Sequence, residues 1–193
     1  MVPQAPKNNQ QVWRELEEAT RAIVTKQKQD AYVVTGPVFA AKKLKTIGNG
    51  VIVPTAVYKA VYLPKTGAIG AYYAPNDNSL KVRIVSVCYL EEQLGINLFP
   101  QLTEEQKRNT YRLPLTAKAV KANQKIEYSN WDAESQCAED VSKENLQALQ
   151  REFKSSGSNT STSSATGGAI DNDTQNTIVK QLIDALLQYI LQL

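Results

Sequence analysis

Four residues near the start of the chain, Asn9, Trp13, Glu17 and Arg21, are spaced four apart and could bind a metal ion and a phosphate. On a helix, this spacing places them along one ridge. An asparagine oxygen can bind Mg²⁺ while leaving most of the coordination sphere to water and phosphate, which suits this ion. Glu17 can orient those waters and Arg21 can contact a phosphate. The spacing alone also fits an ordinary amphipathic helix in which Glu17 and Arg21 form a solvated ion pair.

A helix over residues 8–28 must present these side chains. Its predicted buried face follows three- and four-residue steps, with charged residues mostly elsewhere; this face comprises Trp13, Leu16, Thr20, Ile23, Val24 and Gln27.

The next elements are predicted from alternating apolar residues and turn signals. We expect a short buried strand over Ala31–Thr35, stopped by Gly36-Pro37, and a basic loop over 42–50. A hairpin follows, and then a turn and a further strand. Two helical segments come next, one ending at Gly95 and one starting at Thr103. The hairpin is predicted over Val57–Leu63 and Ala68–Ala74, the turn over Asn76–Ser79 and the further strand over Val82–Val87. The first helical segment is predicted over Cys88–Leu94.

The rest of the chain divides by composition. We expect residues 1–112 to form the main domain and 113–153 to extend it, with a helix over Ser142–Phe153. Residues 154–173 are rich in Ser, Thr and Gly and predict a flexible linker. Residues 174–193 predict an amphipathic helix, which could drive homo-oligomer formation, fold back on the domain or dock as a peptide.

Composition sets further limits. The chain has 193 residues, 42% of them hydrophobic and 21% charged, which is typical of a globular protein. A net charge of +3 is too small to establish a polyanionic partner by itself. The two cysteines, Cys88 and Cys137, could form one disulfide in an exported protein or remain as buried thiols. We find no secretory signal after Met1 and no apolar run long enough to span a membrane.

Several segments in order resemble one known family. Residues 1–21 look like the metal-binding helix and its lead-in in the DNA/RNA non-specific endonucleases. Three later segments also resemble blocks of that family, namely residues 32–39, residues 48–55 with Tyr58-Lys59, and residues 85–100. The resemblance covers about residues 1–112. It implies an α+β fold of the ββα-metal type, with a mixed sheet and helices, that cuts DNA and RNA using Mg²⁺ or a similar divalent cation.

The resemblance also implies roles for matching residues. Asn9 would bind the metal, Glu17 would support its waters, and Arg21 would contact the phosphate. Apart from the resemblance, Lys42, Lys43 and Lys45 could contact nucleic acid or a partner if the domain is a binding module, although such lysines more often form an ordinary solvated loop.

The sequence departs from the family at the general base. The family's Asp-Arg-Gly-His segment lies upstream of this helix, and the chain contains no histidine. We therefore expect an N-terminally incomplete nuclease fold, inactive alone, from a longer protein whose relatives are often exported. The alternatives are a short pseudo-nuclease and a non-catalytic module that binds nucleic acid or protein. Part of the central sheet would be missing, which would leave a sheet edge unpaired.

Overall fold

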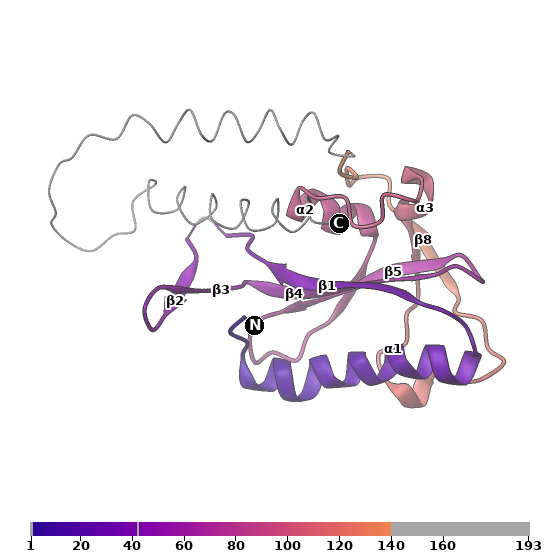
Figure 1. Cartoon of the computed structure of the whole chain (residues 1–193), viewed down its shortest axis with the longest axis horizontal. Helices are drawn as coiled ribbons and strands as arrows, with labels where there is room; N and C mark the ends of the chain where they lie inside the picture. The colour runs from indigo at the N-terminus through magenta and orange to yellow at the C-terminus, as the bar shows by residue number, and fades with distance from the viewer. Residues whose placement is uncertain (1, 42, 140–193) are drawn as a thin grey trace, which may run out of the picture. The chain divides into compact units, whose positions relative to one another are not determined.

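The computed structural model describes residues 2–41 and 43–139, which form an α+β domain, as predicted. A four-stranded antiparallel sheet in the order β1-β4-β5-β6 lies between helix α1 on one face and helices α2 and α3 on the other (Figure 1). The expected helices over 142–153 and 174–193, and the linker between them, fall outside the described residues. None of the helices in the described part is long and apolar enough to cross a membrane.

The elements follow one another closely along the chain. A π-helical turn η1 (Asn8–Trp13) leads into α1 (Arg14–Gln27), and then come β1 (Tyr32–Val38) and a small hairpin of β2 (Lys45–Ile47) and β3 (Val51–Val53). Strands β4 (Ala56–Leu63), β5 (Ala68–Pro75) and β6 (Arg83–Val85) complete the sheet. After the sheet come helices α2 (Val87–Leu94) and α3 (Glu104–Arg108). The described part ends with strand β7 (Asn109–Tyr111), the 3₁₀ turn η2 (Ala117–Ala119) and strand β8 (Tyr128–Trp131).

Strand β4 is the centre of the core, because helices cover both of its faces. Val57, Val61 and Leu63 point toward α1, where they join Trp13, Leu16 and Ile23 in one apolar cluster. Ala56, Tyr58 and Ala60 point to the other face, where they meet Val87, Leu90 and Phe99. The predicted hairpin of residues 57–63 and 68–74 is confirmed, with Val57 paired with Ala74 and Leu63 with Ala68.

Three predictions about the first half of the chain are wrong. Strand β1 is not stopped at Gly36-Pro37 but runs on to Val38, and much of it is exposed rather than buried. A side chain on residue 36 would lie 2.8 Å from the Tyr58 hydroxyl, so glycine makes room for that ring. Pro37 is tolerated because β1 is at the edge of the described sheet.

The other two corrections concern a loop and a helix face. The segment predicted as a basic loop contains the β2–β3 hairpin, whose turn uses Gly48 and Gly50 at positive φ. On α1, Val24 is 38% exposed instead of buried. Ala19 and Ala22 lie in the core beside the predicted Leu16 and Ile23, so the buried face is rotated slightly away from Val24.

The helix ends of the second half agree with their sequence signals. The Ser86 hydroxyl accepts a hydrogen bond from the backbone N–H of Tyr89 at the start of α2, and Gly95 ends this helix in the left-handed conformation. Thr103 and Gln106 form a capping box at α3. The strand predicted over 82–87 is shorter, because Val87 already belongs to α2.

A buried ion pair and a disulfide hold residues 132–138 against α2 and α3. Cys88 and Cys137 are bonded to each other, which decides between the two alternatives left open by the sequence. The Glu91 carboxylate, fully buried, accepts hydrogen bonds from the backbone N–H groups of Leu98 and Ala138. It also lies 3.1 Å from Nζ of Lys107.

Asp132 adds a further link between these segments. Its carboxylate accepts hydrogen bonds from the Ser86 hydroxyl at 2.5 Å and from the backbone N–H groups of Glu134 and Ser135. Burial alone would raise the pKa of Asp132, but these hydrogen bonds lower the pKa to about 2.

Candidate metal and phosphate site

The turn after β5 fixes where the first helix begins. The Asn76 side-chain amide donates hydrogen bonds to the carbonyls of Pro3 and Pro54, and its oxygen accepts one from the backbone N–H of Ala5 at 2.8 Å. The Asn78 side chain accepts a hydrogen bond from the N–H of Lys7. Residues that the sequence suggested only as a turn therefore position the lead-in to η1, and with it Asn9.

The wider spacing of the π-helical turn separates the two neighbouring asparagines. Asn8 and Trp13, five residues apart, are both buried, with 1% and 7% of their surfaces exposed. Asn9 points outward and is exposed. The Nδ2 atom of Asn8 is buried without a hydrogen-bond partner. The expected ridge is therefore not uniform, because Trp13 anchors the helix in the core while Asn9 remains accessible.

Asn9 and Glu17 line one shallow depression beside α1, together with four further residues, Gln4, Gln10, Trp13 and Arg14. Gln4 brings an unexpected feature, because its Oε1 atom is buried and accepts no hydrogen bond. Arg21 is exposed one turn beyond Glu17 and is not among the described residues that line the depression. Lys43 and Lys45 are exposed on the segment that forms the small hairpin, outside the depression, and Lys42 lies outside the described residues.

These donors fit a hydrated divalent cation. Among the described residues, no three His, Cys, Asp or Glu side chains gather into a metal site. The Asn9 amide oxygen and the half-exposed Glu17 carboxylate are oxygen donors at the same depression, which Gln4 also lines, although its unsatisfied Oε1 is buried. Mg²⁺ accepts such a set because it keeps several of its waters when bound.

Lys59, on β4, is the residue at this site that sequence reasoning missed. Its side chain is only 9% exposed and enters the layer between the sheet and α1. Its Nζ lies 5.2 Å from the centre of the Trp13 ring and 4.0 Å from Oε1 of Glu17. Glu17 is thus paired with Lys59, and the ion pair with Arg21 that the spacing suggested is not found among the described residues. The available signal was a lysine within an otherwise apolar strand, which requires a partner when buried.

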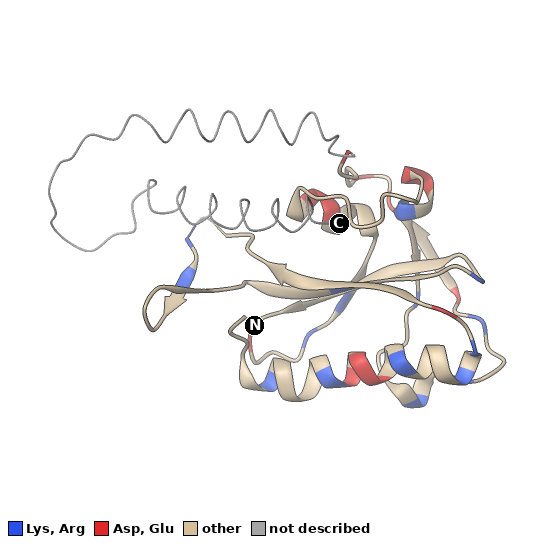
Figure 2. Cartoon of the chain, viewed as in Figure 1, with Lys and Arg blue, Asp and Glu red and all other residues tan. Residues whose placement is uncertain are grey.

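The charges around Lys59 act in opposite directions. Burial lowers the pKa of Lys59 below its ordinary value, because the charged amine loses water. The Glu17 carboxylate raises this pKa and the Arg21 guanidinium lowers it. Figure 2 shows an acidic stretch of α1 with basic positions on either side of it, so the helix carries both signs of charge near the depression.

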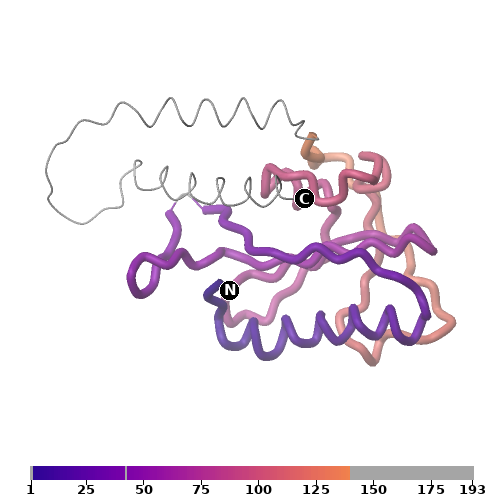
Figure 3. The backbone as a smooth tube through the Cα atoms, in the orientation of Figure 1, coloured from indigo at the N-terminus to yellow at the C-terminus, as the bar shows by residue number. Residues whose placement is uncertain are grey.

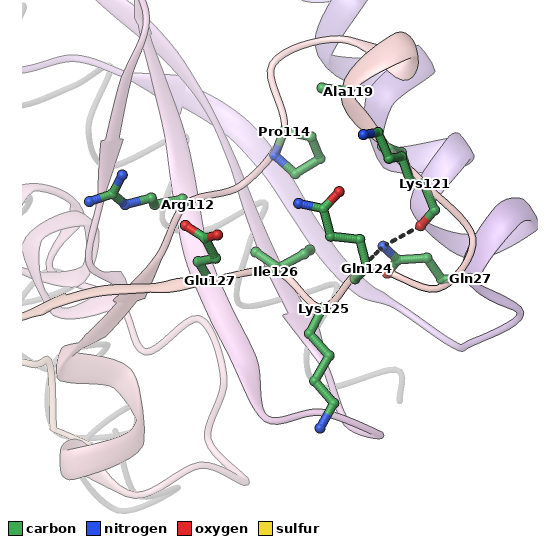
Figure 4. Close-up of a pocket in the computed structure, with 10 residues that line it drawn as sticks. Gln27, Arg112, Pro114, Ala119, Lys121, Gln124, Lys125, Ile126 and Glu127 are labelled. Carbon is green, nitrogen blue, oxygen red and sulfur yellow. Dashed lines mark hydrogen bonds between the residues drawn. The ribbon is translucent and has the colours of Figure 1, made fainter.

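A second concavity at the far end of α1 has a structural explanation. It measures about 170 Å³ and lies where the segment from Arg112 to Glu127 wraps the end of the helix. Figure 4 shows the Gln27 amide pointing at this segment, and it donates hydrogen bonds to the carbonyls of Lys121 and Gln124. Lys26 likewise donates to the carbonyls of Ala117 and Val120. The backbone tube in Figure 3 follows the same wrap, which secures α1 at the end opposite Asn9.

Comparisons with known proteins identify the family to which the chain is related. The family model for the DNA/RNA non-specific endonucleases matches residues 1–105. The mitochondrial nuclease EXOG of Danio rerio is 32% identical over 126 residues, covering 55% of this chain and 36% of that protein. The human mitochondrial endonuclease G is 30% identical over 120 residues, covering 53% of this chain and 40% of that protein. The chain therefore spans less than half the length of these curated relatives.

Proposed function

Because the chain belongs to the DNA/RNA non-specific endonuclease family, we propose that the α1 depression is the metal- and phosphate-binding part of a site that cleaves DNA and RNA. The observation that carries this proposal is that Asn9 and Glu17 line one accessible depression, beside Gln4, whose buried Oε1 has no hydrogen-bond partner. We further propose that the cation is Mg²⁺ or a similar divalent ion.

Each residue has a distinct part in this proposal. The Asn9 amide oxygen binds the cation directly, and the Glu17 carboxylate accepts hydrogen bonds from its waters and so orients them. Gln4 lines the same depression, but its Oε1 is buried and would have to turn outward to accept a hydrogen bond from such a water. Arg21, one turn along the helix, donates hydrogen bonds to a phosphate oxygen. A bound divalent cation supplies Lewis-acid stabilisation of the charge that develops on the phosphate.

The missing element is a general base. The chain has no histidine, and positioned acid–base groups commonly contribute about 10²–10⁴ in rate. We propose that the chain alone does not cleave and that a segment with the family's Asp-Arg-Gly-His motif is needed. The same absence favours a second candidate function, namely a nuclease-like domain that binds nucleic acid or protein without cutting, with Lys43 and Lys45 as exposed contacts.

A cleavage assay tests this directly. Plasmid DNA and RNA are incubated with Mg²⁺ and the chain, with and without a peptide carrying the Asp-Arg-Gly-His segment of a relative. We expect cleavage only in the mixture, and Asn9→Ala should then reduce it by more than about tenfold, because direct ligands are hard to replace. Asn123→Ala, on an exposed turn, is the matched control. Full activity of Asn9→Ala would refute the ligand assignment, and cleavage by the chain alone would refute the need for the added base.

A further inference from the structure

Lys59 is an unusual residue to find in contact with Trp13 and Glu17, which line the proposed cation site. It sits in the middle of β4, which is buried on both faces, and directs a positive charge at the carboxylate nearest the depression. A methionine of similar length would pack against Trp13 without the cost of burying an amine. Nothing in the packing of the sheet requires a charge at this position, so its effect on the depression is the feature to explain.

The charges around the depression show how Lys59 would affect the binding of a cation there. The Glu17 carboxylate is opposed by the Lys59 ammonium at 4.0 Å. Arg14, which also lines the depression, lies 3.9 Å from Glu18, so that its charge is already matched. The depression is therefore close to neutral, and a neutral set of oxygen donors attracts a free dication only weakly. A phosphodiester would bring the missing negative charge.

We propose that Lys59 makes cation binding at this site depend on a bound phosphate group, because it neutralises Glu17. The cation is then held well only together with the phosphodiester of a substrate. This inference rests on the proposed function, since it takes the α1 depression as the cation site.

Calorimetry with Mn²⁺, as a probe for the divalent ion, tests the inference without requiring activity. Binding is measured for the full chain with and without dimethyl phosphate, a soluble phosphodiester anion. We expect dimethyl phosphate to tighten Mn²⁺ binding by the wild-type chain several-fold. Lys59→Met should bind Mn²⁺ alone about tenfold more tightly, which corresponds to removing one nearby positive charge in a partly solvated setting. In this variant dimethyl phosphate should add little.

Four further variants serve to interpret the result. Lys59→Arg keeps the charge and should behave as the wild-type chain, while Lys59→Gln should reproduce the effect of Lys59→Met if methionine disturbs folding. Lys65→Met removes a charge from the exposed β4–β5 turn and should change nothing. Asn9→Ala should lose Mn²⁺ binding in all conditions.

The outcomes separate the inference from the proposed function. Equal Mn²⁺ affinity of the wild-type chain and both neutral Lys59 variants overturns the inference, as does an equal effect of Lys65→Met. Wild-type Mn²⁺ affinity in Asn9→Ala overturns the proposed ligand, whereas the role of Lys59 then stands or falls on its own variants. Failure of every variant and of the wild-type chain to bind Mn²⁺ with dimethyl phosphate overturns both.

Discussion

We predict that Glu91→Gln lowers the free energy of unfolding by about 3–5 kcal/mol, as expected when one partner of a buried ion pair is removed. Glu91 is fully buried and Lys107 is 3% exposed, so the remaining ammonium would be left without its counter-charge. The carboxylate also serves two backbone donors, from Leu98 and Ala138, on different oxygens. An amide has only one acceptor oxygen, so its NH₂ group would face a donor.

Urea denaturation followed by circular dichroism measures this effect, with a matched exposed pair as the control. Glu104 pairs with Arg108 at 2.6 Å, but its side chain is 62% exposed. Glu104→Gln should therefore cost about 1 kcal/mol or less. The double variant Glu91→Gln/Lys107→Met should recover part of the loss, because it leaves no unpaired charge in the core and the glutamine oxygen still accepts one of the two backbone hydrogen bonds. If Glu91→Gln is no more destabilising than Glu104→Gln, the buried pair does not support the fold as argued.

Three further predictions concern the rest of the chain. Replacing both Cys88 and Cys137 by alanine should lower the free energy of unfolding by about 4 kcal/mol in urea denaturation, since the bond closes a loop with a sequence separation of 49; an unchanged midpoint would argue against the bond. The pKa of Asp132 is lowered to about 2, so its stabilisation is present above the ordinary pKa of 3.8 and is lost as the pH falls through about 2. In urea titrations across this range Asp132→Asn should flatten that acid dependence, and an unaltered pH profile would refute the assignment. Leu182→Asp with Leu186→Asp should abolish any self-association seen for the full chain in sedimentation, and equal masses for both proteins at every concentration would count against residues 174–193 as an interface.

Local signals were sufficient where neighbouring residues decide the structure. The caps at Ser86 and Thr103 and the end of α2 at Gly95 follow from side chains and backbone freedom within one turn. The β4–β5 hairpin follows from two apolar runs around Pro64–Gly67, and its partners are adjacent in the chain. These parts of the fold could be predicted because no distant contact is needed to explain them.

Distant contacts explain the parts that could not be predicted. Strand β1 continues past Gly36-Pro37 because it remains paired with β4, its neighbour in the sheet. The Tyr58 ring of β4 occupies the space beside Gly36, where a larger residue would not fit. The sequence marks glycine and proline as breakers, but the pairing with β4 overrides that preference. At the candidate site, the four-residue spacing predicted that Asn9 and Glu17 lie on one side of the helix, and both line the depression. The π-helical turn that buries Asn8 and the pairing of Glu17 with Lys59 depend on tertiary packing and could not be predicted.

The two buried lysines of the described domain show how a structural charge differs from one near a candidate site. Lys107 lies between both oxygens of a fully buried carboxylate and also donates to Asn97, so its charge is used up within the core. Lys59 faces the carboxylate of Glu17, which is half exposed, stands 4.0 Å away and lines an open depression. A fully satisfied buried pair supports the fold and excludes ligands, but a loose pair at a surface leaves the carboxylate free to accept further hydrogen bonds. The incomplete pairing of Glu17 is therefore what a residue that orients the waters of a cation requires.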